Sequence, residues 1–344
     1  MIKVAINGFG RIGRNVVRAC YERTLNEKIQ IVAINDLGDA KINAHLLKYD
    51  TAHGEFAQDV SVQEDTLAIG DDRVIVLSER DPSALPWSDL DIDIVMECTG
   101  LFTQRDAAAM HIDAGAKRVL ISAPGKDADA TIVFGVNDNI LSADDLIVSN
   151  ASCTTNCLAP IAQALHESMG IDKGLANTVH AYTNDQSLND VYHSDPRRAR
   201  AAGRSMIPSK TGAAAAIGLV IPELDGKLDG LSVRVPVLNV SLLDLTVNTS
   251  RETSVDEVNE IMTVAAQNSK GGVLKVNELP LVSSDFNHNS ASSIVDVTQT
   301  KVDGNLVKIL AWYDNEWGFS NRMLDTAQSI FALMNSHSEI DKVA

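Results

Sequence analysis

A cysteine and a histidine lie in settings where they could carry out covalent catalysis. Cys153 falls in the run SNASCTTNC at 149–157, between a buried-strand pattern and the expected start of a helix. The dipole and N–H groups of a helix N-terminus stabilise a thiolate, the reactive form of cysteine. His180 ends a later strand pattern, and its imidazole could take and return the proton of a neighbouring thiol. We predict Cys153 as nucleophile and His180 as base, although the sequence does not establish that they meet.

The other cysteines and most other histidines are interpreted as structural residues. A cysteine is most often a small buried hydrophobic residue, which is our interpretation of Cys20, Cys98 and Cys157. Four cysteines in 344 residues do not make a disulfide framework, and no second pair stands at zinc-ligand spacing, so we expect no metal site. Surface or core positions are expected for His45, His53, His111 and His166.

Three glycines near the N-terminus form the pattern of a dinucleotide-binding loop. Gly8, Gly10 and Gly13 follow a strand pattern and open a helical one, as this fingerprint requires. Such glycines let the backbone approach a pyrophosphate at a helix N-terminus. Asp36 ends the next strand pattern, where its carboxylate could accept from both ribose hydroxyls and repel a 2′-phosphate. The pattern predicts NAD over NADP, and the alternative is a structural turn beside a solvated acid.

Several residues in the second half of the chain could hold an anion. Arg234 is an isolated base in the apolar run LSVRVPV, and both a substrate phosphate and a buried carboxylate remain open as its partner. Thr211 and Gly212 precede an Ala-rich stretch and offer a hydroxyl and a backbone N–H group. A further basic run is typical of a solvated face and comprises Arg197, Arg198, Arg200 and Arg204.

Alternating strand and helix patterns in the first 150 residues would position the glycine loop. Residues 2–7 and 29–35 are apolar and rich in β-branched types, and residues 11–23 between them have helical periodicity. Buried strands that alternate with helices indicate a parallel sheet covered on both faces. Further strand patterns lie at 92–98, 118–122 and 146–149, with a helical pattern at 105–115.

After about residue 150 the strands become longer and alternate in polarity. Such alternation indicates an antiparallel sheet with one face packed on helices. Helices are expected at 153–169, near 210–220 and at 254–267, and a last amphipathic helix at 321–334 is expected to pack on the first domain. The strand patterns lie at 174–183, 231–236, 239–248, 292–300 and 307–313.

The patterns predict an α/β Rossmann dinucleotide-binding domain and an α+β catalytic domain with a mainly antiparallel sheet. We place the first domain at 1–152, joined by a C-terminal helix at about 316–335, and the second at 153–315. Residues 336–344 are polar, and we expect them to form a flexible tail.

The overall charge disfavours two classes of partner. The chain has 29 basic and 46 acidic side chains, a net charge of −17, which argues against nucleic acid and anionic membranes. A local pocket for an anionic substrate is not excluded. The N-terminus lacks the pattern of a signal peptide, and no apolar run reaches the roughly 18 residues of a membrane span. We therefore expect a cytoplasmic protein.

At this point the motifs resemble those of the phosphorylating glyceraldehyde-3-phosphate dehydrogenase family over nearly the full chain. They are INGFGRIGR, SNASCTTN, HAYTNDQ, IPSKTGAA, VRVP and WYDNEWGFSNR, of which the second and last are highly specific. The resemblance implies NAD-dependent oxidation of glyceraldehyde 3-phosphate with inorganic phosphate to 1,3-bisphosphoglycerate. The reaction would pass through a thiohemiacetal and a thioester on Cys153, in glycolysis or gluconeogenesis. It also implies a homotetramer, in which the loop near 184–205 reaches a neighbour's cofactor site.

The resemblance further assigns binding roles. The region for the attacking phosphate matches Ser152, Thr154, Thr211 and Gly212. The site for the substrate's own phosphate matches Thr183, Asp185 and Arg234, with Arg200 on its basic loop. The cofactor contacts match Arg11, Ile12, Asp36, Arg80, Ser122 and Asn315, the last as partner of the nicotinamide carboxamide.

Some residues resemble a sister group, the erythrose-4-phosphate dehydrogenases, which favour hydrolysis of the thioester and would give 4-phosphoerythronate. They are YDTAHG at 49–54, Tyr192-His193 and the run at 285–300. Tyr192 stands where many NAD-specific members of the main family have Pro, and Phe319 replaces a common Tyr. The retained Thr183 and the run SKTGAA at 209–214 favour the three-carbon substrate. A non-catalytic NAD-binding protein or a moonlighting interaction protein is the alternative from another class.

Overall fold

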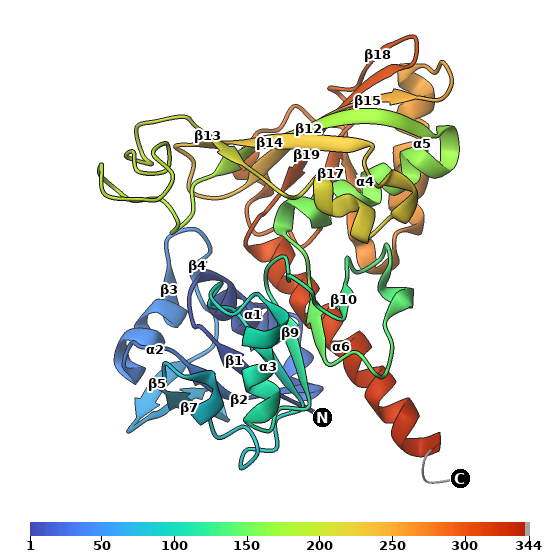
Figure 1. The fold of residues 1–344 in the computed structure, drawn as a ribbon. Coiled ribbons are helices and arrows are strands. Elements are labelled where there is room, and N and C mark those ends of the chain that lie inside the picture. The colour runs from blue at the N-terminus through green and yellow to red at the C-terminus, as the bar shows by residue number, and fades with distance from the viewer. Residues whose placement is uncertain (341–344) are drawn as a thin grey trace. The chain divides into compact units, whose positions relative to one another are not determined.

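The computed structural model describes residues 1–340, with side chains described through residue 335, and these divide into two compact units (Figure 1). The first unit comprises Met1–Ile132, Asp138–Ala151 and the chain from Ser320 onward. The second comprises Val133–Asn137 and Ser152–Phe319. No helix within the described residues is both long and apolar enough to cross a membrane.

The first unit is built on a sheet whose central strands are buried and parallel. The strands β1 (Ile2–Asn7) and β2 (Ile29–Asn35) are rich in Ile, Val and Ala, as a sheet covered on both faces requires. The spatial order is β10 (Ala130–Thr131), β11 (Ile147–Ser149), β9 (Arg118–Ile121), β8 (Ile94–Glu97), β1, β2, β7 (Asp72–Leu77), β6 (Thr66–Ile69), β5 (Val60–Gln63). The pairs from β10 to β7 are parallel, which confirms the predicted Rossmann architecture. The antiparallel edge formed by β5, β6 and β7 was not predicted.

Helices of the first unit cover this sheet. The helix α1 (Arg11–Glu22) begins directly after the glycine loop and buries Val16, Val17 and Cys20. The N-terminus of α2 (Ala40–Lys48) is capped by the side chain of Asp39, which accepts a hydrogen bond from an amide in the first turn. The remaining elements here are α3 (Arg105–Asp113) and the strands β3 (Tyr49–Asp50) and β4 (Gly54–Glu55), with short 3-10 turns at Leu25–Glu27, Pro82–Ala84 and Asp138–Ile140.

The last helix, α6 (Trp317–Ile340), returns to the first unit. The hydroxyl of Thr326 donates to the side-chain oxygen of Asn150 at 2.8 Å, and Arg23 donates to the carboxylate of Asp325 at 2.6 Å. The helix extends to Ile340, so part of the predicted tail is helical in backbone conformation. Residues 341–344 lie outside the described residues.

The second unit is built on a mainly antiparallel sheet, as predicted. The pairs of β12 (Ile171–Ala181) with β14 (Leu228–Val235) and of β16 (Leu274–Asn277) with β17 (Ser293–Asp296) are parallel, and the others are antiparallel. The spatial order is β13 (Ile207–Lys210), β14, β12, β15 (Ser241–Thr249), β19 (Leu306–Tyr313), β17, β16, with β18 (Lys301–Asp303) beside β19.

One face of this sheet packs on helices. Along β15 the side chains alternate between buried and half-buried, which is the period-two pattern of a strand with one covered face. The helix α4 (Cys153–Met169) contacts β12, β15, β17 and β19, and α5 (Val255–Asn268) contacts α4 and β16. Both helices have a serine N-cap whose hydroxyl accepts a hydrogen bond from an amide in the first turn.

The helix predicted near 210–220 was wrong. Residues 207–210 form the strand β13, and Ala215–Leu219 form only a 3-10 turn, followed by another at Pro222–Leu224. Alanine favours helix, but Gly218 weakens it and packs closely on Asp225, and Pro222 stops it. Local propensity was therefore overridden by tight packing within this segment.

Candidate active site

The predicted nucleophile and base lie beside each other. Cys153 is the first residue of α4, and His180 is near the end of β12. The Sγ atom of Cys153 is 3.5 Å from Nε2 of His180, which is within hydrogen-bond reach for sulfur. The sequence had placed the two residues at a helix start and a strand end, and the structure brings those ends together.

The turn before α4 holds the cysteine at the helix N-terminus. Ser152 is the N-cap, and its hydroxyl accepts a hydrogen bond from the N–H group of Thr155 at 3.0 Å. The preceding residue, Ala151, has a φ of 55°, in the left-handed region that a residue with a side chain rarely occupies. Such strain is tolerated where the surrounding structure fixes the backbone, as it does here between β11 and α4.

The His180 ring is fixed by its second nitrogen. Nδ1 lies 2.7 Å from the carbonyl oxygen of Ala181, a geometry that favours a proton on Nδ1 and leaves the Nε2 lone pair directed at Cys153. Arg234 donates to the same carbonyl at 3.1 Å, and its Nη1 atom also lies 2.9 Å from Nδ1. Burial, reinforced by the positive charge of Arg234, lowers the pKa of His180 to about 3. His180 is therefore neutral near pH 7 and able to accept a proton.

Opposing effects act on the pKa of the Cys153 thiol. Burial raises the pKa of Cys153 above its ordinary value, while the charge of Arg234, the hydroxyl of Thr154 and backbone N–H groups of the first helical turn lower it. The net direction is upward, so the helix N-terminus alone does not produce the stabilised thiolate that the sequence suggested. The degree of burial could not be inferred from the sequence.

Tyr313 is a site residue that the sequence analysis missed. Its hydroxyl lies 2.9 Å from the hydroxyl of Thr154 and 2.7 Å from that of Thr178, and its ring meets the His180 ring edge to face. The hydroxyl of Thr154, predicted to bind phosphate, is thus engaged in the core. A signal existed, because Tyr313 ends a strand two residues before Asn315.

Arg234 is placed to serve as an anion-binding group. Its Nη1 atom reaches the hydroxyl of Thr183 at 3.5 Å, which joins two residues predicted to hold the substrate's phosphate. Among residues 1–335, whose side chains are described, Arg234 forms no ion pair with a carboxylate. Of the two partners left open by the sequence, the buried carboxylate is therefore not present.

A different arginine from the predicted one lies near Asp185. Arg198 donates to the carboxylate of Asp185 at 2.5 Å and to the hydroxyl of Ser209 at 2.7 Å, and its side chain is only 24% exposed. Arg200 instead pairs with Asp190 at 2.8 Å and is 64% exposed. The arginine run was interpreted as a solvated face, and that holds for Arg200 but not for Arg198.

The loop with Thr211 and Gly212 lies against the first turn of α4. The carbonyl oxygen of Ala213 accepts a hydrogen bond from the hydroxyl of Thr155 at 3.4 Å, and the hydroxyl of Thr211 accepts one from the N–H group of Ala213 at 3.2 Å. Gly212 is exposed, and its backbone has open space around it. This loop and Ser152 therefore lie near each other, as the predicted phosphate region requires.

In the first unit, the glycine loop lines a pocket of about 320 Å³. A Cβ atom on Gly8 would lie 2.6 Å from the backbone nitrogen of Thr99, and one on Gly13 would lie 2.3 Å from the carbonyl oxygen of Gly8, so both positions require glycine. Asp36 accepts hydrogen bonds from the N–H groups of Phe9 and Gly38, both at 2.9 Å. The lining includes Gly8, Gly10, Asn35, Asp36, Arg80, Cys98, Thr99 and Phe102. A pocket lined by glycine backbone and by a carboxylate that follows a strand fits a dinucleotide.

The remaining predicted cofactor residues are not part of the lining of this pocket. The guanidinium of Arg11 forms an ion pair with the carboxylate of Asp50, so that side chain is engaged within the unit. Ile12 is half-buried in the first turn of α1, and Ser122 follows β9, where its N–H group donates to the carbonyl of Glu97 at 3.0 Å. Asn315 belongs to the second unit and accepts a hydrogen bond from the hydroxyl of Ser241 at 2.8 Å.

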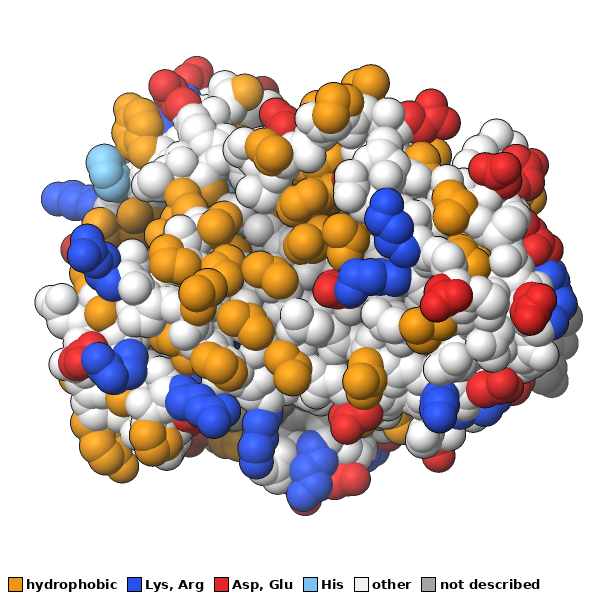
Figure 2. Space-filling view, turned by 90° about the horizontal axis from the view of Figure 1, so that it is seen from above, with side chains coloured by type: hydrophobic (Ala, Val, Ile, Leu, Met, Phe, Trp, Pro, Cys, Tyr) orange, Lys and Arg blue, Asp and Glu red, His pale blue; other side chains and the backbone are white. Residues whose placement is uncertain are grey.

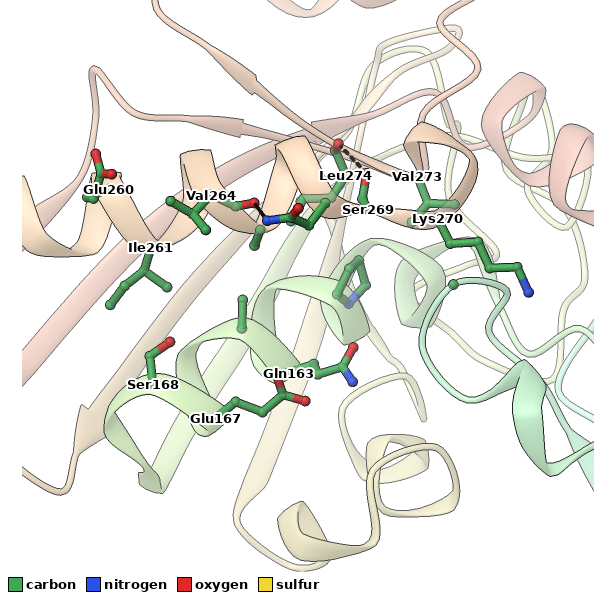
Figure 3. Close-up of a pocket in the computed structure, with 15 residues that line it drawn as sticks. Gln163, Glu167, Ser168, Glu260, Ile261, Val264, Ser269, Lys270, Val273 and Leu274 are labelled. Atoms are coloured by element: carbon green, nitrogen blue, oxygen red, sulfur yellow. Dashed lines mark hydrogen bonds between the residues drawn. The ribbon is translucent and has the colours of Figure 1, made fainter.

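A larger pocket, of about 530 Å³, lies between α4 and α5 and contains none of the predicted residues. In Figure 3, Glu167 and Gln163 project from α4, Glu260 and Val264 from α5, and Lys270 follows α5. Its lining contains neither a cysteine nor a histidine, and the hydroxyl of Ser269 donates to backbone carbonyl groups. Size alone therefore does not identify a catalytic centre, whereas Cys153 and His180 bring a thiol and an imidazole within hydrogen-bond reach.

Comparison with known proteins covers most of the chain. Residues 2–105 match the family model described as the NAD binding domain of glyceraldehyde 3-phosphate dehydrogenase, and residues 152–315 match the C-terminal domain. The chain is 62% identical to a chromosomal glyceraldehyde-3-phosphate dehydrogenase of Cupriavidus necator over 330 residues, which is 96% of this chain and 98% of the relative. It is 62% identical to that of Pseudomonas aeruginosa and 52% identical to that of Geobacillus stearothermophilus, each over 96% of this chain and 98% of the relative.

Proposed function

This chain belongs to the glyceraldehyde-3-phosphate dehydrogenase family, and we propose that it oxidises glyceraldehyde 3-phosphate with NAD and inorganic phosphate to 1,3-bisphosphoglycerate. The observation that carries the mechanism is the 3.5 Å separation of the Cys153 Sγ and His180 Nε2 atoms. The three relatives are all named glyceraldehyde-3-phosphate dehydrogenase, so the four-carbon alternative is not favoured.

In the first step, the thiol of Cys153 adds to the aldehyde carbon. Nε2 of neutral His180 takes the thiol proton as the S–C bond forms and returns a proton to the carbonyl oxygen, which gives a thiohemiacetal. When bound, NAD supplies the acceptor for the hydride that leaves the same carbon. His180 takes the hydroxyl proton in that step, and a thioester on Cys153 remains. Attack of a phosphate oxygen on the thioester carbon breaks the S–C bond and releases the acyl phosphate, and the leaving sulfur of Cys153 takes back the proton held by His180.

We assign the binding of the two phosphate groups to residues around Cys153. Arg234 and Thr183 lie in contact and serve the substrate's own phosphate. Asp185 is assigned to the same site, and its carboxylate accepts a hydrogen bond from Arg198. Ser152, Thr211 and Gly212 serve the attacking phosphate. Arg198, which links Asp185 to Ser209, takes the place that the sequence assigned to Arg200.

The cofactor would be held by the pocket of the first unit. Gly8, Gly10 and Gly13 let the backbone approach the pyrophosphate, and Asp36 accepts from the ribose hydroxyls. Asn315, in the second unit, is assigned to the carboxamide of the nicotinamide. Further contacts are assigned to Arg11 and Ile12 through the first turn of α1, and to Arg80 and Ser122.

We further propose a cytoplasmic homotetramer, as the family resemblance implies. The outer face of the sheet in the second unit, opposite α4 and α5, carries exposed Leu175, Leu231 and Leu306, which are 65%, 49% and 41% exposed. Figure 2 shows hydrophobic side chains gathered on the face seen from above, with Lys and Arg around them. Exposed apolar clusters of this kind commonly mark contacts between subunits. Analytical ultracentrifugation tests the assembly, and a monomer would overturn it.

The activity is tested by steady-state NAD reduction with glyceraldehyde 3-phosphate and erythrose 4-phosphate, each with and without inorganic phosphate. We expect a strong requirement for phosphate and a large preference for the three-carbon aldehyde. Phosphate-independent turnover that favours the four-carbon aldehyde would refute the assignment and the roles of Thr211 and Gly212.

A further inference from the structure

Ser241 joins the catalytic strand to the residue assigned to the nicotinamide. It is the first residue of β15 and is almost fully buried. Its hydroxyl oxygen accepts a hydrogen bond from the N–H group of Ala181, the neighbour of His180, at 3.1 Å. The same hydroxyl donates to Oδ1 of Asn315 at 2.8 Å.

The second of these hydrogen bonds gives the orientation of the Asn315 amide. The hydroxyl of Ser241 has a single proton and directs it at Oδ1 of Asn315, while its oxygen accepts from Ala181. Nδ2 of Asn315 therefore faces away from Ser241. Nδ2 has no hydrogen-bond partner within residues 1–335, which leaves a donor for an acceptor such as the carbonyl oxygen of a carboxamide.

The backbone directly before Ser241 is strained, and side-chain hydrogen bonds anchor the chain on both sides of the strained residue. Val240 has a φ of 69°, in the left-handed region, which is a genuine outlier for a β-branched residue. Asn239, on its other side, donates to the buried carboxylate of Asp314 and to the side chain of Asn287, both at 2.8 Å. Asp314 directly precedes Asn315, so the chain is anchored on both sides of the strained residue. Strain of this kind persists where surrounding contacts over-determine the backbone and often accompanies a functional site.

We propose that Ser241 is a positioning residue that fixes the Asn315 amide as a donor to the nicotinamide carboxamide and ties it to the His180 strand. This inference rests on the proposed function, because it assumes that NAD is the ligand of Asn315. It acts through Asn315 and does not require contact between Ser241 and the cofactor.

The test is the binding of NAD and of ADP-ribose, which lacks the nicotinamide, measured by titration calorimetry on the whole protein. Ser241→Ala should weaken NAD about five- to tenfold, the loss of one oriented hydrogen bond, and leave ADP-ribose within about twofold. Ser232→Ala is the matched control, because it removes another buried hydroxyl of the same sheet, one with no hydrogen-bond partner among the described residues. It should change neither affinity.

A double variant separates a positioning role from a general effect on packing. If Ser241 acts through Asn315, Ser241→Ala with Asn315→Ala should bind NAD as Asn315→Ala alone does. If the alanine variant fails to fold, Ser241→Cys takes its place in the test. Its thiol is a weaker donor of similar size, so the loss of NAD affinity should be intermediate. Equal weakening of NAD and ADP-ribose, multiplying effects in the double variant, or unchanged NAD affinity in Ser241→Cys would each overturn the inference. Failure of the wild type to bind NAD would instead overturn the proposed function.

Discussion

Nη1 of Arg234 lies 2.9 Å from Nδ1 of His180, and both nitrogen atoms lie within hydrogen-bond reach of the carbonyl oxygen of Ala181. A permanent positive charge therefore stands beside the base without forming an ion pair with it. Its effects on the two reacting groups are opposite in kind, since it disfavours the imidazolium and favours the thiolate. The arrangement keeps His180 available as a proton acceptor.

Replacement of Arg234 by leucine should raise the pKa of both groups. Without the positive charge, the imidazolium of His180 is less disfavoured, and the thiolate of Cys153 is less stabilised. The pH profile of Cys153 alkylation by iodoacetamide should move to higher pH, and the NMR titration of His180 should move up from the acid range. A downward shift of either would contradict the assigned geometry. The same variant should raise the Michaelis constant for the aldehyde phosphate by more than tenfold, roughly 1.5–3 kcal/mol for a charged hydrogen bond.

Cys153 should be the cysteine that iodoacetamide modifies fastest. Burial raises the pKa of Cys20, Cys98 and Cys157 to about 12, whereas Arg234 and the helix N-terminus offset part of the effect of burial at Cys153. Because the thiolate reacts, the rate should rise with pH and continue to rise above the ordinary thiol range of about 8.5. Mass spectrometry of peptides identifies the modified residue, with Cys153→Ser as control. Equal rates at all four cysteines would remove the basis for covalent catalysis.

Replacement of Arg198 by leucine should raise the Michaelis constants far more than replacement of Arg200 by leucine. Arg198 is largely covered and bonded to Asp185 and Ser209, so its loss should raise the Michaelis constant for phosphate or for the aldehyde phosphate by about tenfold or more. Arg200 is an exposed partner of Asp190, and its loss should change either constant by less than about twofold. Steady-state kinetics of the two variants test this prediction. A larger effect of the Arg200 variant than of the Arg198 variant would assign Arg200 to the site instead.

Asp36→Asn should weaken the preference for NAD over NADP. The carboxylate accepts from two backbone amides, and an asparagine keeps the shape but loses the charge that repels a 2′-phosphate. We expect the Michaelis constant for NAD to rise about tenfold and that for NADP to fall. Asp39→Asn is the control, since Asp39 is an exposed cap of α2 on the same loop. A wild type that uses both cofactors equally would contradict the role of Asp36.

The sequence predicted elements and motifs more reliably than contacts. The strand at 2–7, the helix start at Cys153 and the glycine loop follow from local patterns, because β-branched runs, cap residues and glycine act within a few positions. The distinction between Arg198 and Arg200 depends on how an irregular loop folds over Ser209, and no local pattern records that. Tyr313 was missed for the same reason, since its partners Thr154 and Thr178 are distant in sequence.

The return of α6 to the first unit has a consequence for the order in which the protein is made. Translation supplies the N-terminal strands first, yet the buried side chains of Met323, Leu324 and Ala327 complete that unit only after the whole second unit has been synthesised. Domains generally fold as units during synthesis. The first unit therefore lacks the buried side chains of its last helix until the second unit has been synthesised.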